Sequence, residues 1–149
     1  MKFVIQKVSE ASVHVEGECI GRINRGFLVF VGIGKEDTKE TADQYIKKMV
    51  NLRIFTDAEG KTNLSLADVG GEVLLISQFT LYANCKKGRR PSFDQAARPE
   101  IASPLYDAFN DALRKTGLVV KPGIFGAEMK VRLLNDGPVT LILDSRELF

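Results

Sequence analysis

The sequence predicts a single α/β domain with a mixed or mostly antiparallel sheet and two main helices. Three observations predict this α+β class: short apolar segments of strand length recur along the chain, only two stretches have helical periodicity, and no linker, repeat or low-complexity tract interrupts them. Two helices are too few for a doubly wound sheet. With 149 residues and 44% hydrophobic content, residues 1–149 are expected to form one domain with a real core.

The N-terminal part is predicted to consist of strands. Residues 2–8 are apolar and strand-like, and Ser12–Glu16 alternate around two valines. Glu16-Gly17-Glu18 is predicted to turn the chain into a returning strand over Cys19–Ile23. Gly26–Gly32 is a nearly continuous apolar run, which is typical of a strand buried on both faces.

The first helix is predicted to begin at Asp37, which can cap its N-terminus. Glu40, three residues later, completes the spacing of a capping box. Apolar residues then recur at helical spacing on one face, and they are Ala42, Tyr45, Ile46, Met49 and Val50. We interpret this stripe as core packing.

The middle of the chain holds the strongest predicted strand. Short strands at Leu52–Phe55 and Asn63–Leu66 come first, and Glu72–Ile76 then runs directly into the polar segment Ser77-Gln78-Phe79-Thr80. A second helix is predicted over about residues 99–116, with Gly117 placed to end it.

The C-terminal part is predicted to be two strands joined by a turn. Apolar and charged residues alternate over Glu128–Leu134, and Thr140–Leu143 forms the final strand. Asn135–Pro138 lies between them and has the composition of a turn.

Composition narrows the function classes. No apolar run is long enough to span a bilayer, and the N-terminus becomes polar too soon for a signal peptide, so we expect a cytoplasmic protein without membrane contact. Cys19 and Cys85 are expected to be free thiols. With His14 as the single histidine, no metal site and no cofactor are expected.

A cluster of positive charge stands out against a net charge of only +2. Lys86, Lys87, Arg89 and Arg90 fall within five positions. The cluster is either a solvated loop or a patch that contacts nucleic-acid phosphates, and the sequence leaves both interpretations open.

Two polar islands in apolar strands are the candidate functional residues. The first is Ser77-Gln78-Phe79-Thr80, where side-chain hydroxyls, an amide and nearby backbone N–H groups could converge on a substrate carbonyl. A plain transition from core to sheet edge would have the same composition. The second is Gly137-Pro138, either an ordinary turn or a cis peptide whose rigid carbonyls recognise a ligand.

Familiar catalytic motifs are missing. A Ser-His-Asp triad would need a histidine near its nucleophile, and His14 sits in an alternating strand pattern that favours a structural role. Gly32-Ile33-Gly34 follows a strand but lacks the third glycine of a dinucleotide fingerprint, so we interpret it as a turn.

The chain resembles the D-aminoacyl-tRNA deacylases over essentially its whole length. The motifs that carry the resemblance are Gln6-Lys7-Val8, Val69–Glu72, Ser77–Leu81, Lys87–Phe93 and Asn135–Thr140. The resemblance implies a barrel-like sheet and a homodimer whose active sites lie at the interface. It also implies hydrolysis of the ester between a D-amino acid and the 3′ end of tRNA, and action on mischarged glycyl-tRNA.

The same resemblance implies roles for the two islands. Gly137 and Pro138, as a cis peptide of one subunit, would hold the substrate α-amino group through backbone carbonyls. Ser77–Thr80 of the facing subunit would hold the ester. An L-side chain would then collide with backbone, so specificity comes from rejection. Lys7 stands where the family usually has an arginine that braces the Gly-Pro loop, and lysine lacks the two-pronged hydrogen bond.

Two mechanisms and two other functions stay open. We favour attack by water assisted by the ribose 2′-hydroxyl, with N–H groups near Phe79 as the oxyanion hole. The alternative is Thr80 as covalent nucleophile, for which the sequence supplies no adjacent base. The other functions are a non-catalytic tRNA-binding module and an editing hydrolase of L-seryl-tRNA.

Overall fold

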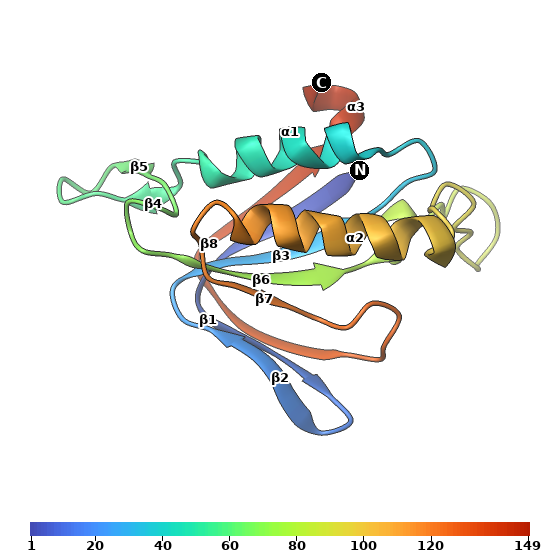
Figure 1. Cartoon of the computed structure of the whole chain (residues 1–149), viewed down its shortest axis with the longest axis horizontal. Coiled ribbons are helices and arrows are strands. Elements are labelled where there is room, and N and C mark those ends of the chain that lie inside the picture. The colour runs from blue at the N-terminus through green and yellow to red at the C-terminus, as the bar shows by residue number, and fades with distance from the viewer.

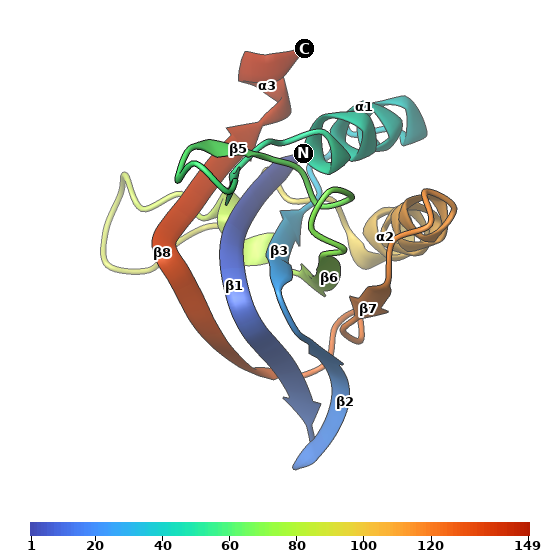
Figure 2. The same cartoon turned by 90° about the vertical axis from the view of Figure 1, so that its left-hand side faces the viewer.

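A computed structural model describes all residues, 1–149, around a six-stranded mixed sheet. The sheet contains β1 (Lys2–Val15), β2 (Glu18–Ile23), β3 (Gly26–Gly32), β6 (Glu72–Ser77), β7 (Val120–Pro122) and β8 (Lys130–Asp144). Its strand order is β2-β1-β3-β6-β7, and β8 pairs with β1. Figure 2 shows the sheet curving round until it is nearly closed into a barrel. The α/β class with a barrel-like mixed sheet is confirmed.

Strand β1 organises the sheet because it has partners along both edges. Its first half pairs antiparallel with β3, its second half with β2, and its other edge with β8. The two predicted strands near the N-terminus are therefore one continuous strand. The β3–β6 and β6–β7 pairs are parallel, which makes the sheet mixed. A small separate hairpin joins β4 (Phe55–Thr56) to β5 (Thr62–Leu64).

Two helices, α1 (Lys39–Val50) and α2 (Pro99–Arg114), lie side by side over one face of the sheet (Figure 1). A cluster of 21 buried residues fills the space between helices and strands. The hydroxyl groups of two buried tyrosines are satisfied by backbone, because Tyr45 donates to the carbonyl of Met1 (2.7 Å) and Tyr106 to that of Leu75 (2.8 Å). A second cluster of seven residues lies between β1, β2, β3 and β6.

The start of α1 differs from the prediction. Thr38 is the N-cap, and it forms a capping box with Thr41 instead of Asp37 with Glu40. Asp37 is engaged elsewhere, because its carboxylate accepts a hydrogen bond from Gly34 N (2.6 Å) and pairs with the α-amino group of Met1. Partners outside the helix therefore displace the cap by one residue.

The end of α2 also differs slightly. The helix stops at Arg114, and the chain makes a further turn before Gly117, which has a φ of +88°. Gly117 N donates to the carbonyl of Arg114 (3.0 Å), so the glycine ends the turn that follows the helix.

The predicted C-terminal turn is a bulge inside one long strand. β8 runs from Lys130 to Asp144 without interruption. Along β1, Gln6 pairs with Thr140 and Val8 with Asn135, so residues 136–139 face Lys7 alone. The extra length pushes these four residues out of the sheet. After β8, the short helix α3 (Ser145–Leu148) ends the described chain.

None of the helices is both long and apolar enough to cross a bilayer. Cys19 and Cys85 are free and exposed, the first in β2 and the second in a loop.

Candidate active site

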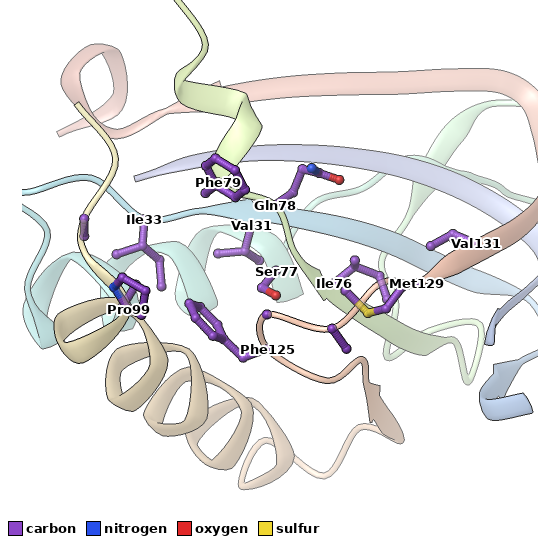
Figure 3. Close-up of a pocket in the computed structure, with 14 residues that line it drawn as sticks. Val31, Ile33, Ile76, Ser77, Gln78, Phe79, Pro99, Phe125, Met129 and Val131 are labelled. Carbon is purple, nitrogen blue, oxygen red and sulfur yellow. The ribbon is translucent and has the colours of Figure 1, made fainter. Parts of the chain in front are cut away.

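A cavity of about 470 Å³ opens beside the carboxyl end of β6. Ten of its 14 lining residues are hydrophobic, and Ser77 and Gln78 supply its only hydrogen-bonding side chains. In Figure 3 the Ser77 hydroxyl points toward Phe125, whereas the Gln78 amide points away from it. The cavity is thus an apolar space with a small polar patch at one wall, as is usual for a site that binds an organic ligand.

Four segments distant in sequence form the walls. The ends of β3 and β6 supply one side, and the N-terminal turn of α2 supplies another. Residues 125–131, which lead into β8, close the remaining side. The lining residues outside the Ser77–Phe79 segment are Val31, Ile33, Ile76, Ala97, Pro99, Ala102, Phe125, Gly126, Ala127, Met129 and Val131.

The polar segment changes conformation as it leaves β6. Gln78 N donates to the carbonyl of Val31 (2.7 Å), which extends the pairing with β3 by one hydrogen bond. The chain then enters the 3-10 helix η1 (Phe79–Tyr82), whose first bond runs from Leu81 N to the carbonyl of Gln78 (3.2 Å). The first N–H groups of such a helix have no acceptor within it, and in η1 these are the N–H groups of Phe79 and Thr80.

Thr80 is placed differently from the rest of its motif. It is exposed and does not line the cavity, and its hydroxyl accepts a hydrogen bond from Nε2 of Gln78. The structure therefore brings Ser77, Gln78 and Phe79 to the cavity and leaves the Thr80 side chain at its rim.

The Gly137–Pro138 bond is cis, and both residues are exposed on the bulge of β8. Asn135 anchors the bulge, since its Oδ1 accepts from Val139 N (3.1 Å) and its Nδ2 donates to Thr140 Oγ1 (2.9 Å). Neither Gly137 nor Pro138 lines the cavity of its own chain.

Lys7 lies beneath this bulge in β1, half-buried. The side-chain hydrogen bonds that hold the bulge come from Asn135 and from Gln6, whose Nε2 donates to Thr140 Oγ1 (3.2 Å). Lys7 contributes none of them, so the two-pronged brace expected of an arginine has no counterpart here.

The four basic residues Lys86, Lys87, Arg89 and Arg90 are all exposed in one loop. A pair of backbone hydrogen bonds between Asn84 and Ser92 closes the loop at its base. Directly after it, the ring of Phe93 packs edge-on against Phe79 with centroids 4.9 Å apart. This contact connects the basic loop to η1, although no residue of the loop lines the cavity.

Most of the apolar lining was not singled out by sequence reasoning. The sequence predicts Phe125 in a loop, Met129 on one face of a strand and Pro99 at the start of a helix, and none of these positions indicates a cavity. The only local signal for these residues is near Gly123, where turn residues give way to an alternation of apolar and charged residues. Which of these segments meet is decided by tertiary packing.

The remaining candidates lie outside the cavity. His14 is part of β1, and its Nδ1 is buried without a partner. No three His, Cys, Asp or Glu side chains come together as a group that could hold a metal ion.

Comparison with known proteins points to one family. The family model described as D-Tyr-tRNA(Tyr) deacylase matches residues 4–144. A D-aminoacyl-tRNA deacylase of Chloroflexus aurantiacus is 58% identical over 148 residues, which are 99% of this chain and 92% of that protein. A D-aminoacyl-tRNA deacylase of Thermosipho africanus is 53% identical over 149 residues, the full length of both chains.

Solved structures share the fold. The c-Myc DNA Unwinding Element Binding Protein has a TM-score of 0.90 at 44% identity, covering 97% of this chain and 98% of that one. A probable eukaryotic D-amino acid tRNA deacylase has a TM-score of 0.82 at 20% identity, covering 95% and 97%, and supports the fold alone. Because the family model spans most of the chain and two full-length relatives exceed half identity, the chain belongs to the D-Tyr-tRNA(Tyr) deacylase family and hydrolyses the ester bond of D-aminoacyl-tRNA.

Proposed function

We propose that the ester is hydrolysed at the start of η1, beside the cavity. The observation that carries this proposal is the pair of N–H groups of Phe79 and Thr80, which have no acceptor within η1. Such groups suit the oxyanion that develops when an ester is attacked, and one well-placed donor contributes about 3–4 kcal/mol to the transition state. Ser77 and Gln78 align the ester next to them.

The attacking group in this proposal is a water molecule assisted by the neighbouring ribose 2′-hydroxyl. An aminoacyl ester is already activated, and correct positioning can supply about 7–11 kcal/mol of the barrier. Thr80 is less suited to be a nucleophile, because its hydroxyl accepts a hydrogen bond from Gln78 and no base accepts its proton. Catalysis therefore rests on backbone donors and on the substrate itself.

The apolar cavity is suited to the terminal nucleoside of tRNA. Its volume of about 470 Å³ and its hydrophobic walls match a planar base with apolar faces. Phe125 supplies an aromatic side chain to the lining. With the base in the cavity, the 3′-linked ester is directed toward Ser77 and the start of η1.

Chiral selection is assigned to Gly137 and Pro138 of a second subunit. They project from β8 and do not line the cavity of their own chain, which supports a role in a neighbouring one. Their carbonyls would hold the substrate α-amino group while η1 holds the ester. The side chain of a D-residue then points to solvent, and that of an L-residue meets backbone. Glycine has no side chain to reject, so glycyl-tRNA is also a substrate.

A homodimer formed along β8 would bring the two parts together. β8 pairs only with β1, and it carries large exposed apolar side chains, with Leu134 58% and Ile142 77% exposed. Exposed apolar patches of this kind usually mark an interface. Two-fold symmetry would create two equal sites, each built from η1 of one chain and Gly137 of the other.

The basic loop is assigned to the tRNA backbone near the acceptor end. Its four exposed positive charges can neutralise phosphates, and the Phe79–Phe93 contact places the loop next to η1. Since its substrate belongs to protein synthesis, we place the protein in the cytoplasm.

Four substrates test the proposed selectivity: D-tyrosyl-, L-tyrosyl-, glycyl- and L-seryl-tRNA, each followed by loss of the ester. We expect release from the D-tyrosyl and glycyl esters only. Comparable release from L-seryl-tRNA would contradict chiral rejection and favour the editing hydrolase. No release from any substrate would favour the binding module.

A matched pair of glycine variants tests the gate itself. Gly137 has a φ of +142°, and a Cβ there would lie 2.7 Å from Cγ2 of Val139, so Gly137→Ala displaces the bulge. Gly60 also has positive φ (+79°) but lies in the remote β4–β5 turn with no atom near a Cβ. We expect Gly137→Ala to lose the preference for D- over L-tyrosyl-tRNA and Gly60→Ala to keep it. Equal selectivity in the two variants would contradict the role of Gly137.

A further inference from the structure

The last residue of η1, Tyr82, lies directly against a glycine. Gly34 is buried, and a Cβ at this position would lie 2.5 Å from Oη and 2.8 Å from Cζ of Tyr82. Two residues earlier, a Cβ at Gly32 would lie 3.0 Å from Cβ of Leu81 and 3.2 Å from the carbonyl oxygen of Gln78. Leu81 and Tyr82 of η1 therefore pack closely against these two glycines.

Two charged side chains, Asp37 and Lys2, also contact these residues. Oδ2 of Asp37 accepts hydrogen bonds from Gly34 N (2.6 Å) and from Oη of Tyr82 (3.4 Å). Nζ of Lys2 donates to the carbonyl of Leu81 (3.4 Å) and lies 4.9 Å from the centre of the Tyr82 ring. Burial, with Asp37 close by, raises the pKa of the Tyr82 phenol, so the phenol remains a donor to the carboxylate.

We propose that Gly32, Gly34 and Asp37 are positioning residues that hold η1 by its C-terminal end. This inference rests on the proposed function, in which the opposite end of η1 presents the N–H groups of Phe79 and Thr80 to the ester. η1 is only four residues long, so a displacement of Tyr82 is passed to Phe79. In this proposal the Gly32-Ile33-Gly34 segment fixes the position of η1.

The positions of the two glycines support a role in packing against η1. Glycine weakens a strand because it adds no packing and has much conformational freedom to lose. Neither Gly32 nor Gly34 has positive φ, so the backbone conformation does not require glycine at either position. What favours glycine is the close approach of the Tyr82 ring at Gly34, and of Leu81 Cβ and the Gln78 carbonyl at Gly32. Ile33, between the two, lines the cavity, so one segment both shapes the pocket and fixes the position of η1 (Figure 3).

Gly34→Ala is the direct test, measured as kcat and KM for D-tyrosyl-tRNA together with the thermal midpoint. We expect kcat to fall about 10- to 100-fold, because misplacing catalytic groups by about 1 Å can cost that much, whereas KM changes less than about threefold. Gly21→Ala in β2 is the matched control, since a Cβ there meets only side-chain atoms at 3.4 Å. Its kcat should equal that of the wild type.

A double-variant cycle shows whether the effect passes through Tyr82. Tyr82→Leu removes the ring atoms that a Cβ at Gly34 would strike, and it folds without that clash. We expect Tyr82→Leu to lower kcat by itself and Gly34→Ala to add no further loss in this background. A wild-type kcat for Gly34→Ala, or losses that multiply in the double variant, would overturn the proposal.

The proposed function is tested separately by Phe79→Pro, which removes a donor N–H from η1. If Phe79→Pro is impaired and Gly34→Ala is not, only the proposal that the glycines position η1 is wrong. If Phe79→Pro is fully active, the oxyanion role of η1 is wrong whatever Gly34→Ala does. Circular dichroism of each variant checks that the fold is intact.

Discussion

The side-chain amide of Gln78 donates a hydrogen bond to the hydroxyl of Thr80, and this is the only hydrogen bond of the Thr80 side chain. A hydroxyl that is to attack an ester needs a base to accept its proton. The Thr80 hydroxyl oxygen instead accepts a hydrogen bond, at the rim of the cavity. The pair stabilises the conformation of the motif, which leaves the chemistry to backbone groups.

We therefore expect Thr80→Ala and Thr80→Val to keep kcat within about tenfold of the wild type, since a single lost neutral hydrogen bond is worth about 0.5–1.5 kcal/mol. Single-turnover hydrolysis of D-tyrosyl-tRNA measures this without interference from product release. An inactive Thr80→Val with an intact fold would favour the covalent mechanism.

Phe79→Pro should lower kcat far more than Phe79→Ala. Phe79 is the first residue of η1, and proline is tolerated at the first position of a helix, where it removes the N–H. Loss of one oxyanion donor typically costs about 100- to 1,000-fold in kcat. Phe79→Ala keeps the donor and removes the ring that packs on Phe93, so it is the matched control. Equal kcat values would show that the Phe79 N–H does not meet the oxyanion.

Features with local causes were predictable from the sequence. The hairpin after β1 was expected at Glu16-Gly17, and both residues have positive φ, +50° and +83°. The apolar stripe of α1 gave its buried face, where Ala42, Tyr45, Ile46 and Met49 are all buried. The cis bond at Gly137-Pro138 was also anticipated from its residues and from the family resemblance.

Features that depend on distant partners were not predictable. Asp37 looked like a helix cap because its partner, the α-amino group of Met1, is 36 residues away. Gly32 and Gly34 looked like a turn because nothing near them in sequence shows that Tyr82 will rest there. The turn expected at Asn135–Pro138 is a bulge because pairing with β1 continues on both sides of it.

Stability at low pH should depend on Asp144, whose pKa is lowered to about 2 mainly by its hydrogen bonds with the Arg146 guanidinium. The unfolded carboxyl takes up its proton near pH 4, so the contribution is complete above about that pH and is lost as the pH falls through about 2. Because the Arg146 side chain is 70% exposed, water screens the pair, and we expect about 1 kcal/mol.

The measurement is the difference in free energy of unfolding between the wild type and Asp144→Asn from pH 2 to pH 7. The difference should shrink as the pH falls. Asp111→Asn, which breaks an exposed pair with Arg114 on α2, is the control and should show little difference at any pH. A difference for Asp144→Asn that does not depend on pH would contradict the assignment.

The basic loop should affect binding and its dependence on salt. Lys87→Ala and Arg89→Ala are each expected to raise KM about three- to tenfold and to reduce the slope of log KM against log salt by about 0.7–0.9, the value for one lost phosphate contact. Lys48→Ala, on the exposed side of α1, removes the same charge far along the chain and should change neither quantity. Unchanged slopes for both loop variants would show that the loop does not touch phosphate.

Mixing two different variants tests whether each active site is shared between chains. Phe79→Pro damages the ester platform and is expected to be nearly inactive, whereas Gly137→Ala damages the gate and is expected to be active without preference for D-tyrosyl-tRNA. In a mixed dimer, one site would then carry both defects and the other none. With Phe79→Pro in large excess, subunit exchange places almost every Gly137→Ala chain in a mixed dimer, so the remaining activity should regain the wild-type preference for D- over L-tyrosyl-tRNA. Gly137→Ala alone should stay unselective. If the mixture also stays unselective while subunit exchange is demonstrated by a mass tag, each site lies within one chain, and Gly137 cannot act across the dimer.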